Sequence, residues 1–197
     1  MTHMFLGRGE ILKAFVGNSS PHSTMTLSLE DIALRPYTKN DLSTLIERHQ
    51  VLCWEEFSYP PDTFGKHVSD GLDQLIQIED AQLWIAEYQP PTTCGSEIPE
   101  KIWAGSIAIV PIGELTGRIR LLLVGSQFRA CGLGNRLIVT ALEYCRTRGY
   151  KRAALSTTGA CVAAHKLYAK HEFERIQATP GTPWGMDSTD EWWEKTL

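Results

Sequence analysis

The fold is decided by residues 121–137, which read LLLVGSQFRACGLGNRL. The four apolar residues Leu121–Val124 are typical of a buried strand, and a polar turn that contains two glycines follows them. From Leu133 to Cys145, apolar residues recur every three or four positions, as they do along one face of a helix. Gly149 stands where a left-handed residue would end that helix. The stretch therefore predicts a strand, a tight glycine loop and an amphipathic helix.

The loop before this helix is a candidate anion site. The first backbone N–H groups of a helix have no partner within the helix and lie at the positive end of its dipole. Gly132 and Gly134 would let a phosphate come close to the main chain. Two nucleotide-binding motifs are excluded. A Walker loop needs Lys and then Ser or Thr where Asn135 and Arg136 stand, and a Rossmann fingerprint needs a third glycine in place of Leu137.

The remaining pattern, Arg129-x-x-Gly132-x-Gly134, resembles the acetyl-CoA signature of the GNAT superfamily of N-acetyltransferases, Gln/Arg-x-x-Gly-x-Gly/Ala. A second block at residues 163–173, AAHKLYAKHEF, resembles that superfamily's Ala-x-x-Leu-Tyr-x-x-x-Gly-Phe. We place His171 at the glycine of this block, where a left-handed backbone would strain it modestly. The two blocks together point to this superfamily.

The resemblance covers most of the chain and implies the GNAT acyl-CoA N-acyltransferase fold. This is an α/β (α+β) domain with a mixed, mostly antiparallel sheet that contains a central parallel strand pair and is flanked by helices. We expect the domain at residues 31–197 and an N-terminal extension at residues 1–30.

The hydrophobic pattern outside the glycine loop predicts elements in the same order. Three successive strands joined without helices should be antiparallel, whereas a strand reached through a helical crossover should be parallel to the strand before the helix. The expected strands are 32–36, 83–88, 102–110, 118–124, 151–156, 173–177 and 191–197, and the expected helices are 42–49, 69–78, 133–145 and 160–170.

Composition limits the partners and the compartment. The net charge of −4 gives no electrostatic case for nucleic acid or for an anionic membrane. The five cysteines are odd in number and lie far apart, without a CxxC pair or a Cys/His cluster that would suggest zinc. No secretory h-region and no apolar run of membrane-spanning length are present. We expect a cytoplasmic monomer or homodimer.

An aromatic segment before a double proline, residues 53–61 (CWEEFSYPP), has two open interpretations. It is either a loop whose rings fold onto the core while its glutamates are solvated, or a wall of a substrate site. In the second case the rings hold an apolar body and the carboxylates receive an amine. The GNAT resemblance favours the second interpretation, because these enzymes commonly shape the acceptor site between their first two helices. The candidate substrate-binding residues are Trp54, Glu55, Phe57 and Tyr59.

The resemblance also implies how acetyl-CoA is held. The strand Leu122–Val124 would pair with the pantetheine arm, and a backbone N–H of Leu122 or Leu123 would polarise the acetyl oxygen. Thr158 occupies a position where relatives often carry Asn, which donates a hydrogen bond to pantetheine. The diphosphate would lie on the backbone N–H groups of Arg129, Ala130, Cys131, Gly132, Leu133, Gly134 and Asn135.

Tyr168 is the candidate general acid, because the superfamily's tyrosine in this block lies near the cofactor sulfur and can protonate the leaving thiolate. The general base is not identified by the sequence. Glu55 and Glu56 are candidates, directly or through a water, and so is His165, which is otherwise a residue on a helix face.

The predicted function is therefore an acetyl-CoA-dependent N-acetyltransferase. It would transfer an acetyl group to the amine of a small molecule by direct transfer in a ternary complex, with acetyl-CoA as co-substrate and without a metal. Two alternatives stay open: a catalytically degenerate domain that binds acyl-CoA, and an acetyltransferase for protein lysines or N-termini.

Several short segments, at 34–36, 54–57, 120–124 and 184–194, resemble the acetyltransferase half of bacterial MarR–GNAT fusion proteins. The segment before Ile32 is too short for the winged-helix half of such a fusion. We therefore expect no role in transcription and no nucleic-acid partner.

Overall fold

A computed structural model describes residues 28–92 and 98–197 of the chain. The predicted N-terminal extension, residues 1–30, lies outside the described residues except at 28–30. The strands are β1 (Ile32–Pro36), β2 (Gln82–Tyr88), β3 (Ile102–Pro111), β4 (Thr116–Val124), β5 (Arg152–Thr158), β6 (Glu174–Gly181) and β7 (Ser188–Thr196). The helices are α1 (Asp41–Phe57), α2 (Pro61–Leu75), α3 (Leu133–Thr147) and α4 (Val162–Lys170). Short 3₁₀ turns lie at η2 (Leu29–Asp31), η3 (Ser126–Phe128) and η4 (Pro183–Gly185).

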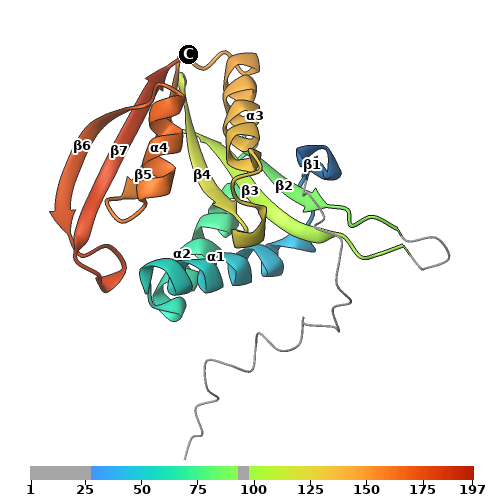
Figure 1. The fold of residues 1–197 in the computed structure, drawn as a ribbon. Helices are drawn as coiled ribbons and strands as arrows, with labels where there is room; N and C mark the ends of the chain where they lie inside the picture. Colours follow the sequence, from blue (N-terminus) through green and yellow to red (C-terminus); the bar gives the residue numbers. More distant parts are fainter. Residues whose placement is uncertain (1–27, 93–97) are drawn as a thin grey trace, which may run out of the picture.

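One seven-stranded sheet runs through the molecule in the order β1-β2-β3-β4-β5-β7-β6 (Figure 1). Neighbouring strands are antiparallel except for the central pair β4 and β5, which is parallel. This confirms the predicted fold class. The parallel pair follows from the connection, because the chain leaves β4, crosses through α3 and returns in the same direction as β5.

The core lies in two layers, one on each face of the sheet. Alternate side chains of β3 enter different layers: Ile107 and Ile109 pack with α3, whereas Ala108 and Val110 pack with α1 and α2. Tyr168 of α4 belongs to the layer that contains α3. The two helix pairs therefore cover opposite faces, and the sheet separates them (Figure 1). No helix in the described ranges is long and apolar enough to span a membrane.

The double proline has a different effect from the one expected. The helix α1 continues to Phe57 and ends at Ser58, whose φ of 58° is left-handed, so most of the aromatic segment is helical and not a loop. The next helix begins at Pro61 and not near residue 69. A proline at the first helical position loses no hydrogen bond and has a suitable φ, which explains why Pro61 starts a helix.

The end of α4 corrects another prediction. His171 has an ordinary φ of −94°, and the left-handed residue is Glu172, with φ 60°. The amide of Phe173 donates to the carbonyl of Tyr168 and the amide of Glu172 donates to that of Ala169, which is the Schellman arrangement. Glu172 directly precedes Phe173, so it is Glu172 that occupies the glycine position of the block.

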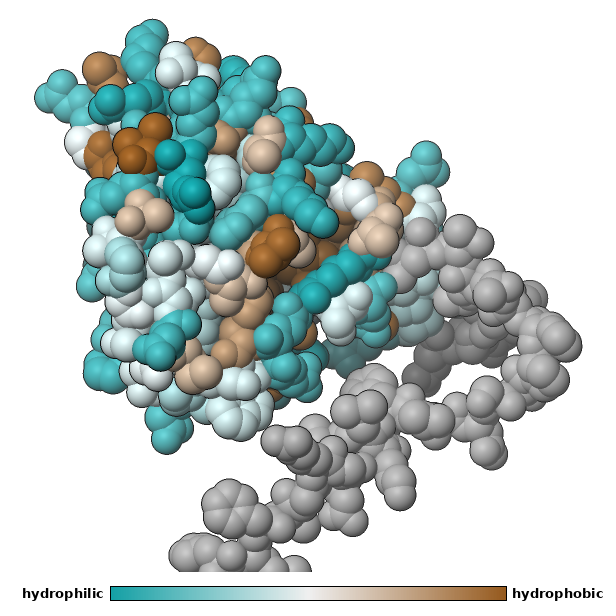
Figure 2. Space-filling model, turned by 60° about the vertical axis from the view of Figure 1, so that its left-hand side comes forward, coloured by the Kyte–Doolittle hydropathy of each residue, from teal (hydrophilic) through white to brown (hydrophobic). Residues whose placement is uncertain are grey.

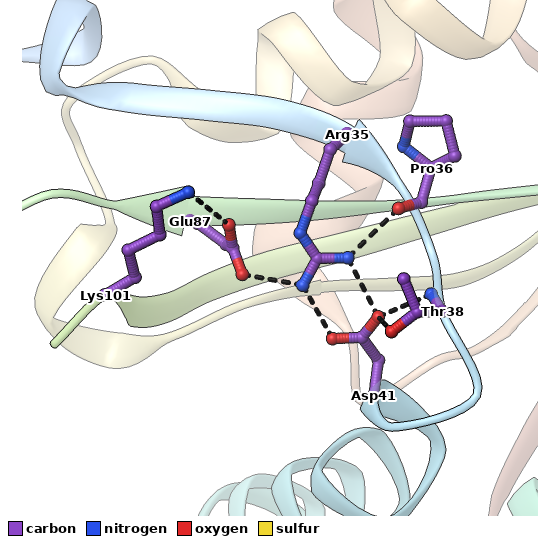
Figure 3. Close-up of polar contacts among 6 residues, drawn as sticks. All are labelled: Arg35, Pro36, Thr38, Asp41, Glu87 and Lys101. Atoms are coloured by element: carbon purple, nitrogen blue, oxygen red, sulfur yellow. Dashed lines mark hydrogen bonds and ion pairs between the residues drawn. The ribbon is translucent and has the colours of Figure 1, made fainter.

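A polar network joins the end of β1 to α1 and β2 (Figure 3). Both terminal nitrogens of Arg35 donate to the carboxylate of Asp41, at 2.8 and 2.7 Å, and one also donates to Glu87 at 2.6 Å. Thr38 donates to Asp41 through its amide and its hydroxyl, and Lys101 donates to Glu87. The hydrogen bonds from Arg35 lower the pKa of Asp41 to about 2. This network fixes the direction in which α1 leaves the sheet.

Candidate active site

The site is organised by a separation of the two parallel strands. Pairing between β4 and β5 begins at Thr116 with Arg152 and ends at Ile119 with Leu155. The register of β4 against β3 shifts directly after this, so that Leu121 and Leu122 lie opposite the single residue Ile107. Such a bulge bends a strand away from its regular path.

The bulge has a specific backbone conformation. Leu121 has a left-handed φ of 54°, and the hydroxyl of Ser106 donates to its carbonyl at 2.8 Å. A left-handed leucine is strained and persists only where its surroundings hold it. The buried hydroxyl of Ser106 is one such restraint, and the bent end of β4 is therefore fixed by the core.

A cavity of about 720 Å³ lies at the gap between the two strands. One wall is formed by residues 118–123 of β4 and the opposite wall by residues 155–158 of β5, with Tyr168 from α4. The lining also contains residues of α1 and α2, the end of β6 with the turn after it, residues 179–184, and Asp190 of β7. In Figure 2, hydrophobic side chains line a recess near the centre of the described surface, with hydrophilic residues on both sides.

The glycine loop forms the start of α3, beyond the end of β4. Gly132 is the N-cap of α3 with φ 94°, and no side chain caps the helix. Ala130 is also left-handed, with φ 62°. Successive turns of this kind direct backbone N–H groups into a concave loop that suits an anion. Gly134 serves a different purpose, because a Cβ there would lie 3.2 Å from a methyl of Leu167 on α4.

Arg129 is engaged within the protein. Its amide donates to the carbonyl of Ser126 at 3.4 Å, and its guanidinium donates to the carbonyl of Val124 and forms an ion pair with Glu56. The side chain therefore links the last turn of α1 to the end of β4, where the glycine loop begins.

The predicted substrate residues divide into two groups. Phe57 and Tyr59 line the cavity and stack on one another, with ring centroids 5.3 Å apart. Trp54 is 48% exposed, and neither Trp54 nor Glu55 contributes to the cavity lining. Glu56 also lies outside the lining, in its ion pair with Arg129. The division follows from the helical conformation of this segment, which spreads adjacent residues around α1.

The predicted cofactor and acid residues also divide by position. Leu122, Leu123, Thr158 and Tyr168 line the cavity together, whereas Val124 and residues 129–135 lie outside its lining, toward and at the start of α3. The glycine loop therefore lies beyond the end of β4 and does not line the cavity.

Tyr168 is buried, with 6% of its surface exposed, and its ring packs against Phe173 and Trp193. Burial raises its pKa well above the usual value for a tyrosine, so the phenol keeps its proton at neutral pH. The side chain can therefore donate a hydrogen bond or a proton into the cavity.

His165 contacts other residues of the protein and does not face the cavity. Its Nε2 lies 3.0 Å from the carbonyl of Thr158 and 3.3 Å from the carboxylate of Glu191, and its ring stacks on Trp193. It is not part of the cavity lining. These contacts tie α4 to the strands β5 and β7.

The structure adds His49, which the sequence analysis did not single out. Its Nδ1 lies 2.8 Å from the carbonyl of Leu45, and because a carbonyl only accepts, Nδ1 carries the proton and Nε2 is left as an acceptor. Nε2 is buried and has no partner among the described residues, and the residue lines the cavity. Burial lowers the pKa of His49 to about 4, so the imidazole is neutral at pH 7.

Trp184 and His67 close one side of the cavity. Their ring centroids are 4.3 Å apart, and Phe64 meets Trp184 edge-on at 5.2 Å. The cavity also contains two arginines of β4, Arg118 and Arg120. A sequence signal for the arginines existed, because two charged residues at alternate positions interrupt an otherwise apolar strand.

Comparisons with known proteins indicate the family and the fold. A family model described as "Acetyltransferase (GNAT) family" matches residues 48–173. No similar sequence was found among curated proteins.

Several solved structures share the fold. An acetyltransferase from Streptococcus agalactiae has a TM-score of 0.65 at 19% identity, over 85% of this chain and 99% of its own. A spermidine N-acetyltransferase from Vibrio cholerae, in complex with CoA and spermine, has a TM-score of 0.62 at 13% identity, over 85% and 96%. A GNAT family acetyltransferase from Elizabethkingia anophelis with acetyl-CoA bound has a TM-score of 0.56 at 18% identity, over 85% and 99%. With the family model spanning more than half of the chain, this protein belongs to the acetyltransferase (GNAT) family.

Proposed function

We propose that the protein is an acetyl-CoA-dependent N-acetyltransferase that acetylates the amine of a small molecule by direct transfer in a ternary complex. The observation that carries the proposal is the separation of β4 from β5 beyond Ile119 and Leu155, next to a helix whose N-terminus has no side-chain cap. The separated strand edge suits an extended pantetheine arm, and the loop suits a diphosphate.

In this proposal the cofactor is held mainly by backbone groups. The N–H groups of residues 129–135 that face the concave loop bind the diphosphate, and the edge of β4 at Leu122–Val124 pairs with the pantetheine amides. Thr158 is already bonded to the hydroxyl of Tyr59 at 2.6 Å, so it offers pantetheine only its remaining hydrogen-bonding capacity. Backbone contacts of this kind place the thioester without requiring particular side chains.

The chemical step needs an electrophile, a neutral amine and a protonated leaving group. The amine nitrogen attacks the thioester carbon, a carbon–nitrogen bond forms, and the carbon–sulfur bond breaks. A backbone N–H of Leu122 or Leu123 stabilises the negative charge on the carbonyl oxygen. Tyr168 gives its proton to the departing thiolate, since burial keeps that proton in place at neutral pH.

The proton lost by the amine needs an acceptor in the cavity. Glu55 and Glu56 lie outside the lining, so they would act only through a chain of waters. His49, His67 and Asp190 line the cavity and are the candidate proton acceptors. We propose that the acceptor amine binds in its neutral form and loses its proton to one of these groups through water.

The volume and the aromatic lining of the cavity favour a small acceptor. The whole cavity has a volume of about 720 Å³, and Phe57, Phe64 and Trp184 are part of its lining. A cavity of this size suits a small molecule better than an extended peptide. We also propose, from the sequence, that the enzyme acts in the cytoplasm as a monomer or homodimer without a metal. From the same sequence segments, we propose that the domain is similar to the acetyltransferase half of MarR–GNAT fusion proteins.

The test is release of free thiol from acetyl-CoA by the purified protein in the presence of a panel of amines. Calorimetric titration with acetyl-CoA accompanies it. Binding together with amine-dependent thiol release supports the proposal. Binding without release for every amine would favour a degenerate acyl-CoA-binding domain, and release only with peptides would favour a protein acetyltransferase.

A further inference from the structure

Two arginines project from the same face of β4 into the cavity. Arg118 and Arg120 occupy alternate positions of the strand, and Ile119 between them packs with the α3 layer. The arginines therefore lie on the α1 and α2 side of the sheet. The glycine loop at the start of α3 lies on the opposite side of the sheet. A diphosphate held by that loop therefore cannot be the partner of these two arginines.

Neither arginine is neutralised by the described part of the chain. Arg118 donates to the hydroxyl of Ser156 at 2.7 Å and lies over the ring of Trp192, but its Nε is buried without a partner. Arg120 forms no hydrogen bond and no ion pair with the described residues. Burial lowers the pKa of both groups, and their like charges add to this for Arg120. Asp190 attracts Arg118 only from a distance, without forming an ion pair.

Four other arginines of the protein are paired. Arg35, Arg129, Arg148 and Arg175 each form an ion pair with a carboxylate. Burying a cation without a counter-charge is costly, and partly buried pairs normally avoid that cost. The other described arginines without an ion pair, Arg48, Arg146 and Arg152, are exposed, and Arg136 donates to the carbonyls of Leu29 and Ile32. Arg118 and Arg120 therefore differ from them, because they are partly buried in the cavity lining and have no carboxylate partner among the described residues.

The structure also provides space for one of these groups. A Cβ on Gly71 of α2 would lie 2.5 Å from a terminal nitrogen of Arg120. The glycine thus leaves room for the guanidinium against α2. Any side chain at this position would displace the guanidinium.

We propose that Arg118 and Arg120 bind an anionic group of the acceptor, so that the substrate class is a small amine that also carries a carboxylate, as an amino acid does; this rests on the function proposed above. The guanidinium fork matches a carboxylate in two hydrogen bonds. The aromatic residues Phe57, Phe64 and Trp184 hold the apolar body between that carboxylate and the amine. Burial and the two arginines lower the pKa of His67, so this imidazole is neutral at neutral pH. Two guanidinium groups and the carboxylate of Asp190 then leave the lining with an excess of positive charge, which disfavours polyamines.

The experiment compares acceptors that differ only in their charge. Thiol release is measured with amino acids, with the corresponding amides and with the corresponding decarboxylated amines. The concentration of each acceptor is varied up to saturation. We expect kcat/KM for the best acid to exceed that for its amide by about 10- to 100-fold, as for loss of a charged hydrogen-bonded pair. Amides or decarboxylated amines that react as well as the acids would overturn the proposal.

Two variants locate the effect. Arg120→Gln should raise KM for the acid by about 10- to 100-fold. The KM for the amide and the dissociation constant of acetyl-CoA should not change. Because Arg120 has no partner among residues 28–92 and 98–197, this variant should fold with an unchanged or higher Tm. Arg148→Gln, which removes an exposed guanidinium paired with Asp80, is the matched control and should change none of these values. Equal effects of the two variants would contradict the assignment.

A binding measurement separates this proposal from the proposed function. Thermal shift is recorded with the same acids and amides in the presence of CoA. If no amine is acetylated, stabilisation by an acid over its amide, absent in Arg120→Gln, would support the anion site although acetyl transfer has failed. The same stabilisation by both forms in the wild type would overturn the anion site.

Discussion

The hydroxyl groups of Tyr59 and Thr158 lie 2.6 Å apart and join the segment between α1 and α2 to the end of β5. Both residues are buried and both line the cavity. This hydrogen bond therefore connects the acceptor side of the cavity with the strand that separates from β4.

The first prediction concerns this pair. Tyr59→Phe should lower the free energy of unfolding by about 1 kcal/mol, because it removes one buried hydrogen bond and keeps the stacked ring. Thr158→Ala should cost a similar amount, and the double variant should cost little more than either single variant, since both remove the same interaction. Urea unfolding of the four proteins measures the coupling. Fully additive effects would show that the two hydroxyls do not stabilise one another.

The second prediction concerns Tyr168. Tyr168→Phe should lower kcat by about 10²- to 10⁴-fold, as expected for loss of a general acid. The dissociation constant of acetyl-CoA and the Tm should change little, because the ring keeps its packing against Phe173 and Trp193. Stopped-flow or steady-state thiol release measures kcat, and calorimetry measures binding. An unchanged kcat would remove Tyr168 from the mechanism.

The pH dependence of kcat adds a second check on Tyr168. Burial raises the pKa of this phenol, so its proton remains available throughout the neutral and mildly alkaline range. The wild type should therefore show no loss of kcat from this group up to about pH 10, the ordinary tyrosine value. A fall of kcat centred near pH 8, absent in Tyr168→Phe, would contradict this assignment.

The third prediction concerns the turn after α4. Glu172→Gly should raise Tm by about 3 °C, because glycine adopts the left-handed conformation without strain. The variant also loses the ion pair with Lys195, but the glutamate side chain of that pair is exposed, so the loss should cost little. Glu172→Ala is the control, because it removes the ion pair but keeps a Cβ at the strained position. Calorimetry should rank the glycine variant above the alanine variant. The reverse order would show that the conformation of Glu172 is not strained.

The fourth prediction concerns His49. Its pKa is about 4 in the folded protein and near 6.5 when unfolded, so between these values the unfolded state binds more protons. This contribution to stability is complete above pH 6.5 and is lost as the pH falls toward 4, with a total of about 3 kcal/mol. His49→Gln should flatten the unfolding free energy over this range. A wild-type profile without this slope would contradict the burial of a neutral His49.

Much of the fold could be predicted from sequence because its signals are local. The run Leu121–Val124, the paired glycines and the helical periodicity after Leu133 specify a strand, a loop and a helix, and the connection lengths then specify which strands are parallel. The double proline does not predict its own role, because Pro61 can either end or begin a helix, and only the packing of α2 against the sheet decides which.

The site was less predictable than the fold. The bulge at Leu121 depends on the hydroxyl of Ser106 from a neighbouring strand, and no pattern within β4 indicates it. The acceptor side is assembled from residues far apart in the chain, such as His49, Arg120 and Trp184, so their proximity appears only in the folded protein. The sequence pattern predicts the left-handed residue at His171, one position too early, because nothing in the sequence marks Glu172 as left-handed.

The most direct test of the central claim is a crystal structure of the protein with acetyl-CoA. The account predicts that the diphosphate lies on the backbone N–H groups at the start of α3. It also predicts that the pantetheine arm runs along β4 into the gap between β4 and β5, with the thioester sulfur within hydrogen-bonding distance of the hydroxyl of Tyr168. Acetyl-CoA bound outside that gap, or with its diphosphate away from the glycine loop, would contradict it.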